Sequence, residues 1–386
     1  MSQKTFAYVS SWSHGERASG LSLYSYDEET GGFTLIKQID DKTEFAVSTV
    51  DTRRKILYIV DESGNLPELR TGGGGRLFAF RIDPATGDLE QISCVPTWCP
   101  NPSYVALDKE GKYLVVSNHA GRAAVTKLVR DAFGKMRGCV EFDDSVVDLF
   151  EVNEDGSVGE LVDAAKHEGS GPDPKFQMNP HPHCAILSPC GRFFTVCDKG
   201  NDGVYMYTIN REKGRLVLTN APYACPPGSR PRFAAYHPTK PYLYHNNEAG
   251  GKISAYRYDE GGRLEPIGAY DIRTAEHAET PGRWEQQDFR MDGKGRYLYS
   301  LTTAPAGVVV CRVDQEDGSL ETVQNLLLQE ERPRACALSP DGRFLAVACL
   351  GSGHLVTLAV GEDGLLRETG TVTDHDSAAF ITFYQP

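Results

Sequence analysis

The chain alternates between short runs of apolar residues and clusters of turn-forming residues. One recurring unit reads apolar-x-apolar, a turn, and then glycine, a basic residue, an aromatic residue and a further apolar run. It occurs as YVALDKEGKYLVVSN from Tyr104, CAILSPCGRFFTVCD from Cys184, FAAYHPTKPYLYHNN from Phe233, FRMDGKGRYLYSLT from Phe289 and CALSPDGRFLAVAC from Cys336, with a degraded copy, VSTVDTRRKILYIVD, from Val47. Short apolar segments bounded by turns predict strands joined as hairpins.

A second unit follows each copy of the first and consists of an alternating run, an acidic turn, and then glycine and leucine. Its copies are LSLYSYDEETGGF, RLFAFRIDPATGDLE, VYMYTINREKGRL, KISAYRYDEGGRLE, VVVCRVDQEDGSLE and HLVTLAVGEDGLL, with a weaker copy, AAVTKLVRDAFG. The two units together predict four strands per repeat. Repeats of this kind, at a spacing of roughly 45 to 80 residues, are typical of propeller blades.

The two ends of the chain predict how the ring closes. Six blades are complete in the sequence, TFAYVSSW reads as a second strand, and AAFITFYQP reads as a first strand without a partner. Pairing these two segments makes a seventh blade and removes the free edges. A linear solenoid would need polar capping repeats, which neither end resembles. We therefore expect an all-β, seven-bladed β-propeller: a single domain over residues 1–386, closed by pairing the C-terminal strand with the N-terminal strands, and containing an insertion at residues 131–182.

Composition narrows the range of partners. The net charge of −13 disfavours nucleic acid, and no run of about 18 apolar residues predicts a membrane span. The N-terminus has no apolar signal core, so we expect a cytoplasmic protein. None of the ten cysteines forms a Cys-x-x-Cys pair, which disfavours a disulfide scaffold and a structural zinc site. We expect no cofactor, and a monomer or a weak homo-oligomer.

The propeller topology converts sequence positions into a candidate site. The first strand of each blade lines the channel and the second runs antiparallel to it, so first-strand starts and second-strand ends meet at one mouth. Residues of three kinds should meet there: at first-strand starts His183, Arg232 and Arg334, at second-strand ends Asn118, His119 and Glu248, and in the loop before a first strand Arg283. Three arginines gathered in an acidic chain indicate a site for a small anion.

The segment PHPHCAILSP places His181 and His183 on one face of a strand. A metal site would need further ligands, and acidic residues are scarce at the strand starts. We therefore interpret His183 as an acid/base residue. We interpret His181 as a supporting residue and count it among the substrate-binding residues. The alternatives are structural: a histidine bonded to a backbone carbonyl, arginines paired with acidic turns, and a solvated Glu248.

Three segments occur in the order and spacing of a known family: AYVSSWSHGERASGLSLYSYDEETGGF, NPSYVALDKEGKYLVVSNHAG and HEGSGPDPKFQMNPHPHCAILSPCGRFF. On these residues almost the whole chain resembles the seven-bladed propeller lactonases. That family includes the cycloisomerase-type 6-phosphogluconolactonases and the fungal carboxy-cis,cis-muconate lactonizing enzyme. The resemblance implies that His183, Arg232 and Glu248 carry the family's chemistry, and that Arg283 is a second substrate-binding arginine.

The chain also departs from the phosphogluconolactonase-like pattern. Its NEAGG segment at Glu248 resembles the muconate-cyclising branch, where the other branch usually reads Asn-Glu-Leu. Arg290 stands where that branch has a histidine, Thr302-Thr303 where it has an Asn-Arg pair, and Tyr104 at a position often held by histidine. These differences leave the phosphosugar substrate open, whereas lactone or carboxylate chemistry remains the expectation.

We expect a metal-independent lactonase that hydrolyses a sugar-acid or related carboxylate lactone, in the manner of the 6-phosphogluconolactonases. His183 and Glu248 would form the acid/base pair, with Glu248 activating water or orienting the imidazole. Arg232 and Arg283 would clamp the anion, with lesser contacts from Arg334 and Asn118. The alternatives are a cycloisomerase that forms a lactone from an unsaturated dicarboxylate, and a propeller that only binds a partner.

Overall fold

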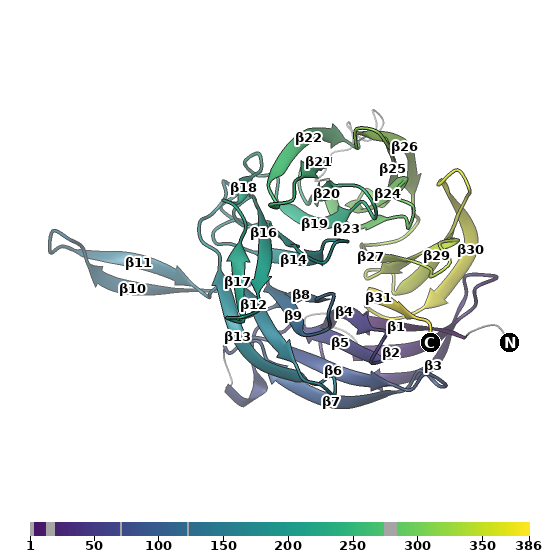
Figure 1. Cartoon of the computed structure of the whole chain (residues 1–386), viewed down its shortest axis with the longest axis horizontal. Helices are drawn as coiled ribbons and strands as arrows, with labels where there is room; N and C mark the ends of the chain where they lie inside the picture. Colours follow the sequence, from purple (N-terminus) through teal and green to yellow (C-terminus); the bar gives the residue numbers. More distant parts are fainter. Residues whose placement is uncertain (1–3, 13–19, 70–71, 122, 274–283) are drawn as a thin grey trace.

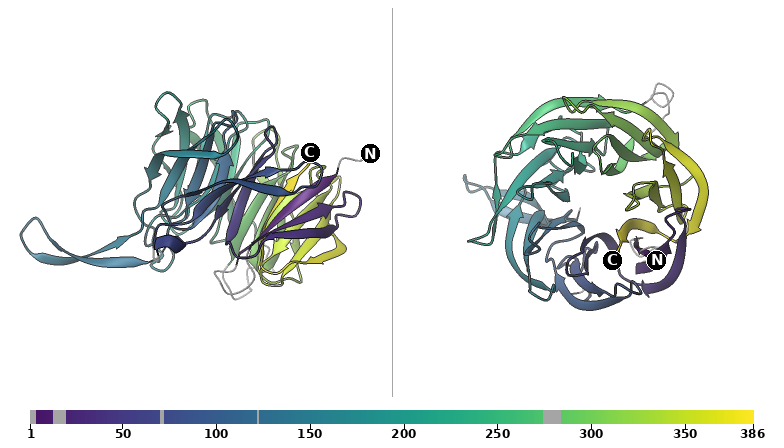
Figure 2. Two further views of the ribbon diagram at one scale, coloured as in Figure 1. Left: turned by 90° about the horizontal axis from the view of Figure 1, so that it is seen from below. Right: turned by 45° about the vertical axis from the view of Figure 1, so that its right-hand side comes forward.

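The computed structural model describes residues 4–12, 20–69, 72–121, 123–273 and 284–386. Over these residues, seven antiparallel sheets form the blades of a ring, and one two-stranded hairpin projects from it (Figure 1). The right-hand view of Figure 2 looks onto the ring of blades. Among the described residues, no helix is long and apolar enough to cross a membrane.

The first three blades follow the chain from the N-terminal side. Blade 1 contains β4 (Phe45–Asp51), β5 (Ile56–Asp61), β6 (Arg76–Ile82) and β7 (Leu89–Pro96), with a turn of 3-10 helix, η1 (Pro67–Leu69), between β5 and β6. Blade 2 contains β8 (Pro102–Leu107), β9 (Tyr113–Asn118), β12 (Val146–Val152) and β13 (Val158–Lys166). Blade 3 contains β14 (Pro182–Leu187), β15 (Phe194–Asp198), β16 (Gly203–Asn210), β17 (Arg215–Leu218) and β18 (Tyr223–Ala224).

The remaining blades complete the ring. Blade 4 contains β19 (Pro231–Tyr236), β20 (Tyr242–Asn247), β21 (Lys252–Tyr258) and β22 (Leu264–Asp271). Blade 5 contains β23 (Glu285–Met291), β24 (Tyr297–Ala304), β25 (Ala306–Val313) and β26 (Leu320–Leu327). Blade 6 contains β27 (Pro333–Leu338), β28 (Phe344–Cys349), β29 (His354–Val360) and β30 (Leu366–Asp374). Blade 7 combines β31 (Ala378–Tyr384) with β1 (Thr5–Ser11), β2 (Gly20–Tyr26) and β3 (Phe33–Asp40).

Blade 7 closes the ring, as the sequence predicted. β1 pairs with β2 along one edge and with β31 along the other, so the two ends of the chain share one sheet. The innermost strands contact one another in the cyclic order β31, β4, β8, β14, β19, β23 and β27, and β27 contacts β31 again. The predicted all-β propeller and its mode of closure are therefore confirmed.

Apolar side chains packed between neighbouring blades hold the ring together. One such cluster joins blade 7 to blade 1 and includes Phe6, Tyr8, Phe45 and Leu57, all nearly fully buried. The second strands are buried along their whole length, because neighbouring blades cover both of their faces. This explains why they read as continuous apolar runs in the sequence rather than as alternating ones.

The structure corrects the boundaries of the predicted insertion. β12 and β13 lie within residues 131–182, yet they are the outer strands of blade 2. The weaker copy of the second unit, AAVTKLVRDAFG, instead supplies β10 (Ala124–Arg130), which pairs only with β11 (Met136–Phe142). Burial gives the physical reason: β10 is exposed along its whole length, whereas Val147, Leu149 and Phe150 of β12 are buried between blades. We call residues 124–142 the arm.

Candidate functional site

The starts of the innermost strands and the ends of the second strands lie together at one end of the ring, which we call the mouth. A hollow of about 320 Å³ at the mouth is lined by Trp12, Lys199, Arg232, Glu248 and Arg334, among others. A second, smaller hollow of about 20 Å³ contains His183 and shares Trp12 and Arg334 with the first. The structure thus brings His183, Arg232, Glu248 and Arg334 to one place, as the topology argument expected.

Glu248 lies at the centre of a buried group of cations. Its carboxylate is 2.7 Å from Lys199 Nζ, 3.2 Å from Arg232 Nε and 3.5 Å from an Arg230 Nη1. Burial would raise the pKa of Glu248, but Lys199, Arg232 and Arg230 outweigh it and lower that pKa to about 2. Glu248 is therefore a permanent carboxylate that holds three cations in position.

Burial also lowers the pKa values of the two cations nearest to Glu248. It lowers the pKa of Lys199 to about 8, with Arg232 and Arg230 adding to the effect and Glu248 opposing it. Burial and the neighbouring Arg334 lower the pKa of Arg232 to about 10. Lys199 can consequently exchange a proton near neutral pH, while Arg232 stays charged.

Arg232 has unused hydrogen-bonding capacity. Its side chain is only 3% exposed, and its Nη1 finds no hydrogen-bond partner among the described residues. A buried guanidinium nitrogen without a partner is costly, because it has lost its water without replacement. An anion in the hollow that Arg232 lines would remove that cost.

Arg334 lines the same hollow. Its guanidinium lies 4.5 Å from the centre of the Trp12 ring, a cation–π arrangement. Its two terminal nitrogens lie 3.4 Å from Gln287 Oε1 and 3.5 Å from Glu62 Oε2. Arg334 lines both hollows, so its guanidinium is a second cation within reach of an anion there.

His183 is a neutral imidazole. Burial, together with the positive charges of Arg232 and Lys199, lowers its pKa well below the ordinary value. Its ring packs 4.9 Å from Phe233, and its Nδ1 has no hydrogen-bond partner among the described residues. It is thus not a histidine fixed by a backbone carbonyl, and an anion bound nearby would raise its pKa by offsetting the cations.

The other predicted residues support the mouth or lie elsewhere. His119 stacks on His181 at 4.5 Å and meets His183 edge-on at 5.7 Å. His181 is fully buried, and its Nδ1 lies 2.6 Å from the His119 carbonyl oxygen. Asn118 is also fully buried and donates to Asp148 at 2.7 Å. Of the predicted binding residues, Asn118, His119 and His181 are not among the described residues that line the two hollows. Arg283 lies outside the described residues.

The positions that depart from the phosphogluconolactonase-like pattern have other contacts. Arg290 is paired with Asp288 at 2.8 Å and donates to the Cys336 carbonyl. Tyr104 packs on Phe233 at 5.9 Å. Of the two threonines, Thr302 donates to the Pro305 carbonyl, while Thr303 lines the larger hollow and donates to the Pro333 carbonyl.

Sequence reasoning missed Lys199 and Arg230. Lys199 directly follows β15, which is the same place in its blade that Glu248 holds after β20. The rule that selected Glu248 would therefore have selected Lys199 in the segment CDKGN. Arg230 precedes β19 by one residue in GSRPRF, and its guanidinium covers the Phe176 ring at 5.0 Å. Among the described residues there is no group of three or more His, Cys, Asp or Glu that could hold a metal.

Known proteins resemble this chain along nearly its full length. The family described as Lactonase, 7-bladed beta-propeller matches residues 6–383. The 6-phosphogluconolactonase of Formosa agariphila is 25% identical over 353 residues, 90% of each chain, and that of Bacillus subtilis is 24% identical over 378 residues, 96% of this chain and 94% of the other. The structure of a periplasmic gluconolactonase from Pseudomonas aeruginosa is 25% identical with a TM-score of 0.85, over 99% of this chain and 100% of its own.

Fold and site together define a closed β-propeller with a polar, cation-rich hollow at one mouth. The chain belongs to the lactonase family of seven-bladed β-propellers. The resemblance drawn from the sequence is confirmed, and so is the prediction of an enzyme of the lactonase class.

Proposed function

We propose that this protein hydrolyses the lactone of a sugar acid, or of a related carboxylic acid, and that it does so in the hollows at the mouth. The observation that carries the proposal is the buried group of cations around Glu248, with a free Arg232 nitrogen beside the neutral His183. Relatives named 6-phosphogluconolactonase and gluconolactonase support a sugar-acid lactone as the substrate class.

The chemistry follows from the charge state of each group. Neutral His183 accepts a proton from a water molecule whose oxygen attacks the lactone carbonyl carbon. Arg232 stabilises the negative charge that develops on the carbonyl oxygen. The bond between the carbonyl carbon and the ring oxygen then breaks, and Lys199 donates a proton to the leaving oxygen. The product is the open-chain hydroxy acid.

We assign Glu248 a positioning role in this reaction. Its pKa of about 2 makes it a weak base, which disfavours the activation of water by this carboxylate. Its close contacts with Lys199 and Arg232 fix the direction of both cations instead. We likewise propose a cytoplasmic location, which is supported by the ten free cysteines.

A panel of lactones tests the proposed function. We expect the purified protein to hydrolyse sugar-acid lactones with and without a phosphate group, at rates that exhaustive treatment with a chelator leaves unchanged. Loss of activity that an added divalent metal restores would contradict the metal-independent reaction. The panel should include an unsaturated dicarboxylate, because its cyclisation would instead indicate a cycloisomerase. Inactivity on every compound would favour a binding module.

The pH dependence tests the role of Lys199. Lys199 donates a proton, so activity should fall as the pH rises through its pKa of about 8. Lys199→Arg should remove this decline and also lower the maximal kcat, because a guanidinium keeps its proton and is a poor acid. Lys199→Met should lower kcat by about 10²–10⁴-fold at pH values below that pKa, and the difference from wild type should narrow at higher pH, where wild-type Lys199 has also lost its proton.

The exposed Lys252 on β21 offers a matched control. Lys252→Met should leave the pH profile unchanged once spontaneous hydrolysis is subtracted. An alkaline decline at the same pH in wild type and Lys199→Arg would rule out Lys199 as the proton donor.

A further inference from the structure

The arm is the part of the structure that the proposed function does not use. β10 and β11 form an isolated hairpin that leaves the ring between β9 and β12 and extends well beyond the blades (Figures 1 and 2). A two-stranded hairpin alone is marginally stable in water, and it needs a further layer against its apolar face. We therefore expect another protein surface to pack against the arm.

One face of the arm is apolar. Directly opposed residues of an antiparallel pair project to the same side, and successive residues project to opposite sides. Leu128 and Thr126 on β10, with Val140 and Met136 on β11, consequently share one face. Leu128 is 75% exposed, and Met136 and Val140 are also exposed. Arg130, opposite Met136, is on the same face, and the exposed Val125 and Val129 are on the other. Several large apolar side chains exposed on so short a hairpin are typical of a docking surface.

The tip of the arm presents an aromatic side chain on a well-defined turn. Phe133 is 88% exposed. Asp131 accepts from the backbone amides of Phe133 and Lys135, both at 2.9 Å, and pairs with Arg137 at 2.7 Å. Because these bonds lie within the hairpin, they fix the turn before any partner binds. An exposed aromatic on a rigid turn is well suited to anchor an interface, since little conformational entropy is lost on binding.

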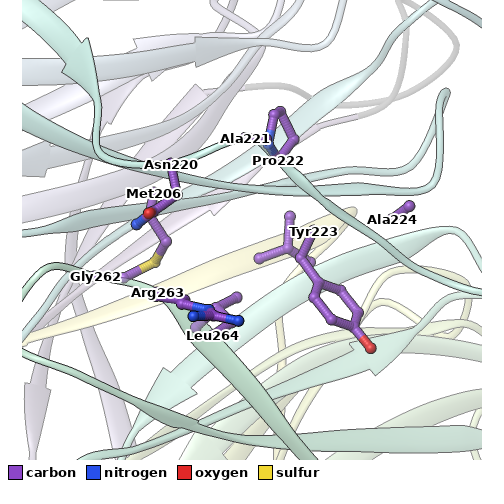
Figure 3. A pocket seen from close by; sticks show the side chains of 10 residues that line it. Met206, Asn220, Ala221, Pro222, Tyr223, Ala224, Gly262, Arg263 and Leu264 are labelled. Atoms are coloured by element: carbon purple, nitrogen blue, oxygen red, sulfur yellow. The ribbon is translucent and has the colours of Figure 1, made fainter.

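The same molecule carries a groove of matching character on its outer rim. β17 ends after four residues, and the chain crosses residues 219–222 before β18 pairs with the other half of β16. The resulting groove of about 370 Å³ is lined by Met206, Pro222, Tyr223 and Leu264, among others (Figure 3). An apolar cavity of about 150 Å³ holds benzene, so this groove can receive a phenyl ring.

Exposed apolar side chains continue the groove along β17. Val217 and Leu218 of that strand are 42% and 41% exposed. β18 and the arm both lie on the left-hand side of Figure 1, on neighbouring blades. A dimer in which the arm of each copy contacts the groove of the other, about a two-fold axis on that side, is isologous.

Charge favours a second copy as the occupant. Residues 124–142 contain four basic and two acidic residues, a net charge of +2, which leaves −15 on the rest of a chain whose net charge is −13. The arm is thus attracted to the acidic body of another copy. This attraction comes from the overall charge of the chain, because the groove itself is lined by Arg263 and by no acidic residue.

Area favours an exchange of arms over a simple stack. Strand geometry gives each arm a face of about 23 by 10 Å, so two arms stacked on each other bury roughly 500 Å², well below a stable interface. In the exchange, each of the two arms covers an area of about its own size on the other copy, so four such faces are buried. Together with the tips this buries roughly 1,000–1,200 Å², near the lower end of stable interfaces.

We propose that the protein forms a two-fold dimer in which the arm of each copy, led by Phe133, docks in the groove between blades 3 and 4 of the other copy. Sedimentation equilibrium over a micromolar concentration series tests this. Wild type should dimerise, and Phe133→Ser should raise the dimer dissociation constant by on the order of 10²-fold or more, because each dimer loses two anchors. Lactonase activity and Tm should stay at wild-type values, since the arm lies outside the blades.

Two further variants fix the partner surface. Ala221→Arg, at an exposed lining residue of the groove, should weaken the dimer as strongly as Phe133→Ser. Mixing the two variants should restore a heterodimer, because one intact arm then meets one intact groove. Leu35→Ser is the control, because it also replaces an exposed apolar side chain by serine, but on β3, away from the arm and the groove. It should leave the dimer dissociation constant unchanged.

Each contrary result overturns a stated part of the proposal. A monomeric wild type would overturn the proposed dimer. A dimer insensitive to Phe133→Ser would remove the arm from the interface. A dimer sensitive to Phe133→Ser but not to Ala221→Arg would remove the groove.

Discussion

Deleting residues 378–386 should prevent the ring from folding stably. This segment is β31, whose Phe380, Ile381 and Tyr384 are buried between blades 6, 7 and 1. Three such side chains contribute about 5–9 kcal/mol of burial free energy, against the 5–15 kcal/mol total stability of an ordinary domain. The deletion also removes the backbone partner of β1. Thermal unfolding followed by circular dichroism should show a strongly lowered Tm or no cooperative transition.

A shorter deletion separates this effect from a general effect of truncation. Gln385 and Pro386 follow β31 and are exposed, so removing only these two residues should leave Tm nearly unchanged. Adding the missing strand as a synthetic peptide should restore part of the stability of the longer deletion. An unchanged Tm after deletion of 378–386 would mean that the blades are stable without ring closure.

His183→Ala and Arg232→Ala should separate turnover from binding. His183 has no hydrogen-bond partner at Nδ1 among the described residues, so its loss should leave substrate binding near wild type and lower kcat by on the order of 10²-fold or more. Arg232 should act mainly through affinity, because it contributes a charge-assisted contact to the anion. His183 packs on Phe233 of the neighbouring blade, and Arg232 is paired with the buried Glu248, so Tm should fall in both variants. Binding and kcat should therefore be compared well below each variant's unfolding transition.

The repeat made the fold predictable from the sequence. Each blade repeats the same two strand-turn-strand units, and the half-blade at each end can be completed only by the other end. The strands of a propeller have no other way to bury both faces and leave no edge at the junction. Local pattern and global topology therefore agree.

The arm shows where the pattern failed. Its first strand, AVTKLVR, alternates in the same way as a blade strand, and it comes directly after β9, where the third strand of blade 2 was expected. Alternation describes a strand with two different faces, but it does not say which neighbour covers either face. The true third strand, Val146–Val152, is distinguished by burial, which only the assembled ring reveals.

The sequence predicted which residues meet at the mouth, but not the charge states of their side chains. Topology alone brought His183, Arg232, Glu248 and Arg334 to the mouth. The charge state of Glu248 depends on three cations within 3.5 Å. One of them, Arg230, has a repeat counterpart in Arg332, since each precedes an innermost strand by one residue, so the repeat gives its position but not its contact with Glu248. Distances of this kind follow from side-chain packing in three dimensions, so the sequence could not assign the roles of Glu248 and Lys199.

The most direct test of the central claim is to titrate the open-chain acid product into wild type and Arg232→Ala, and to measure kcat of His183→Ala on the corresponding lactone. Arg232→Ala should bind the acid about 10–150-fold more weakly, the equivalent of about 1.5–3 kcal/mol for a charge-assisted contact. Arg312→Ala, which removes an exposed arginine paired with Glu321, should bind it as wild type does. His183→Ala should bind normally and turn over on the order of 10²-fold more slowly or worse. If both mouth variants bind and turn over like wild type, the anionic lactone is not opened in these hollows.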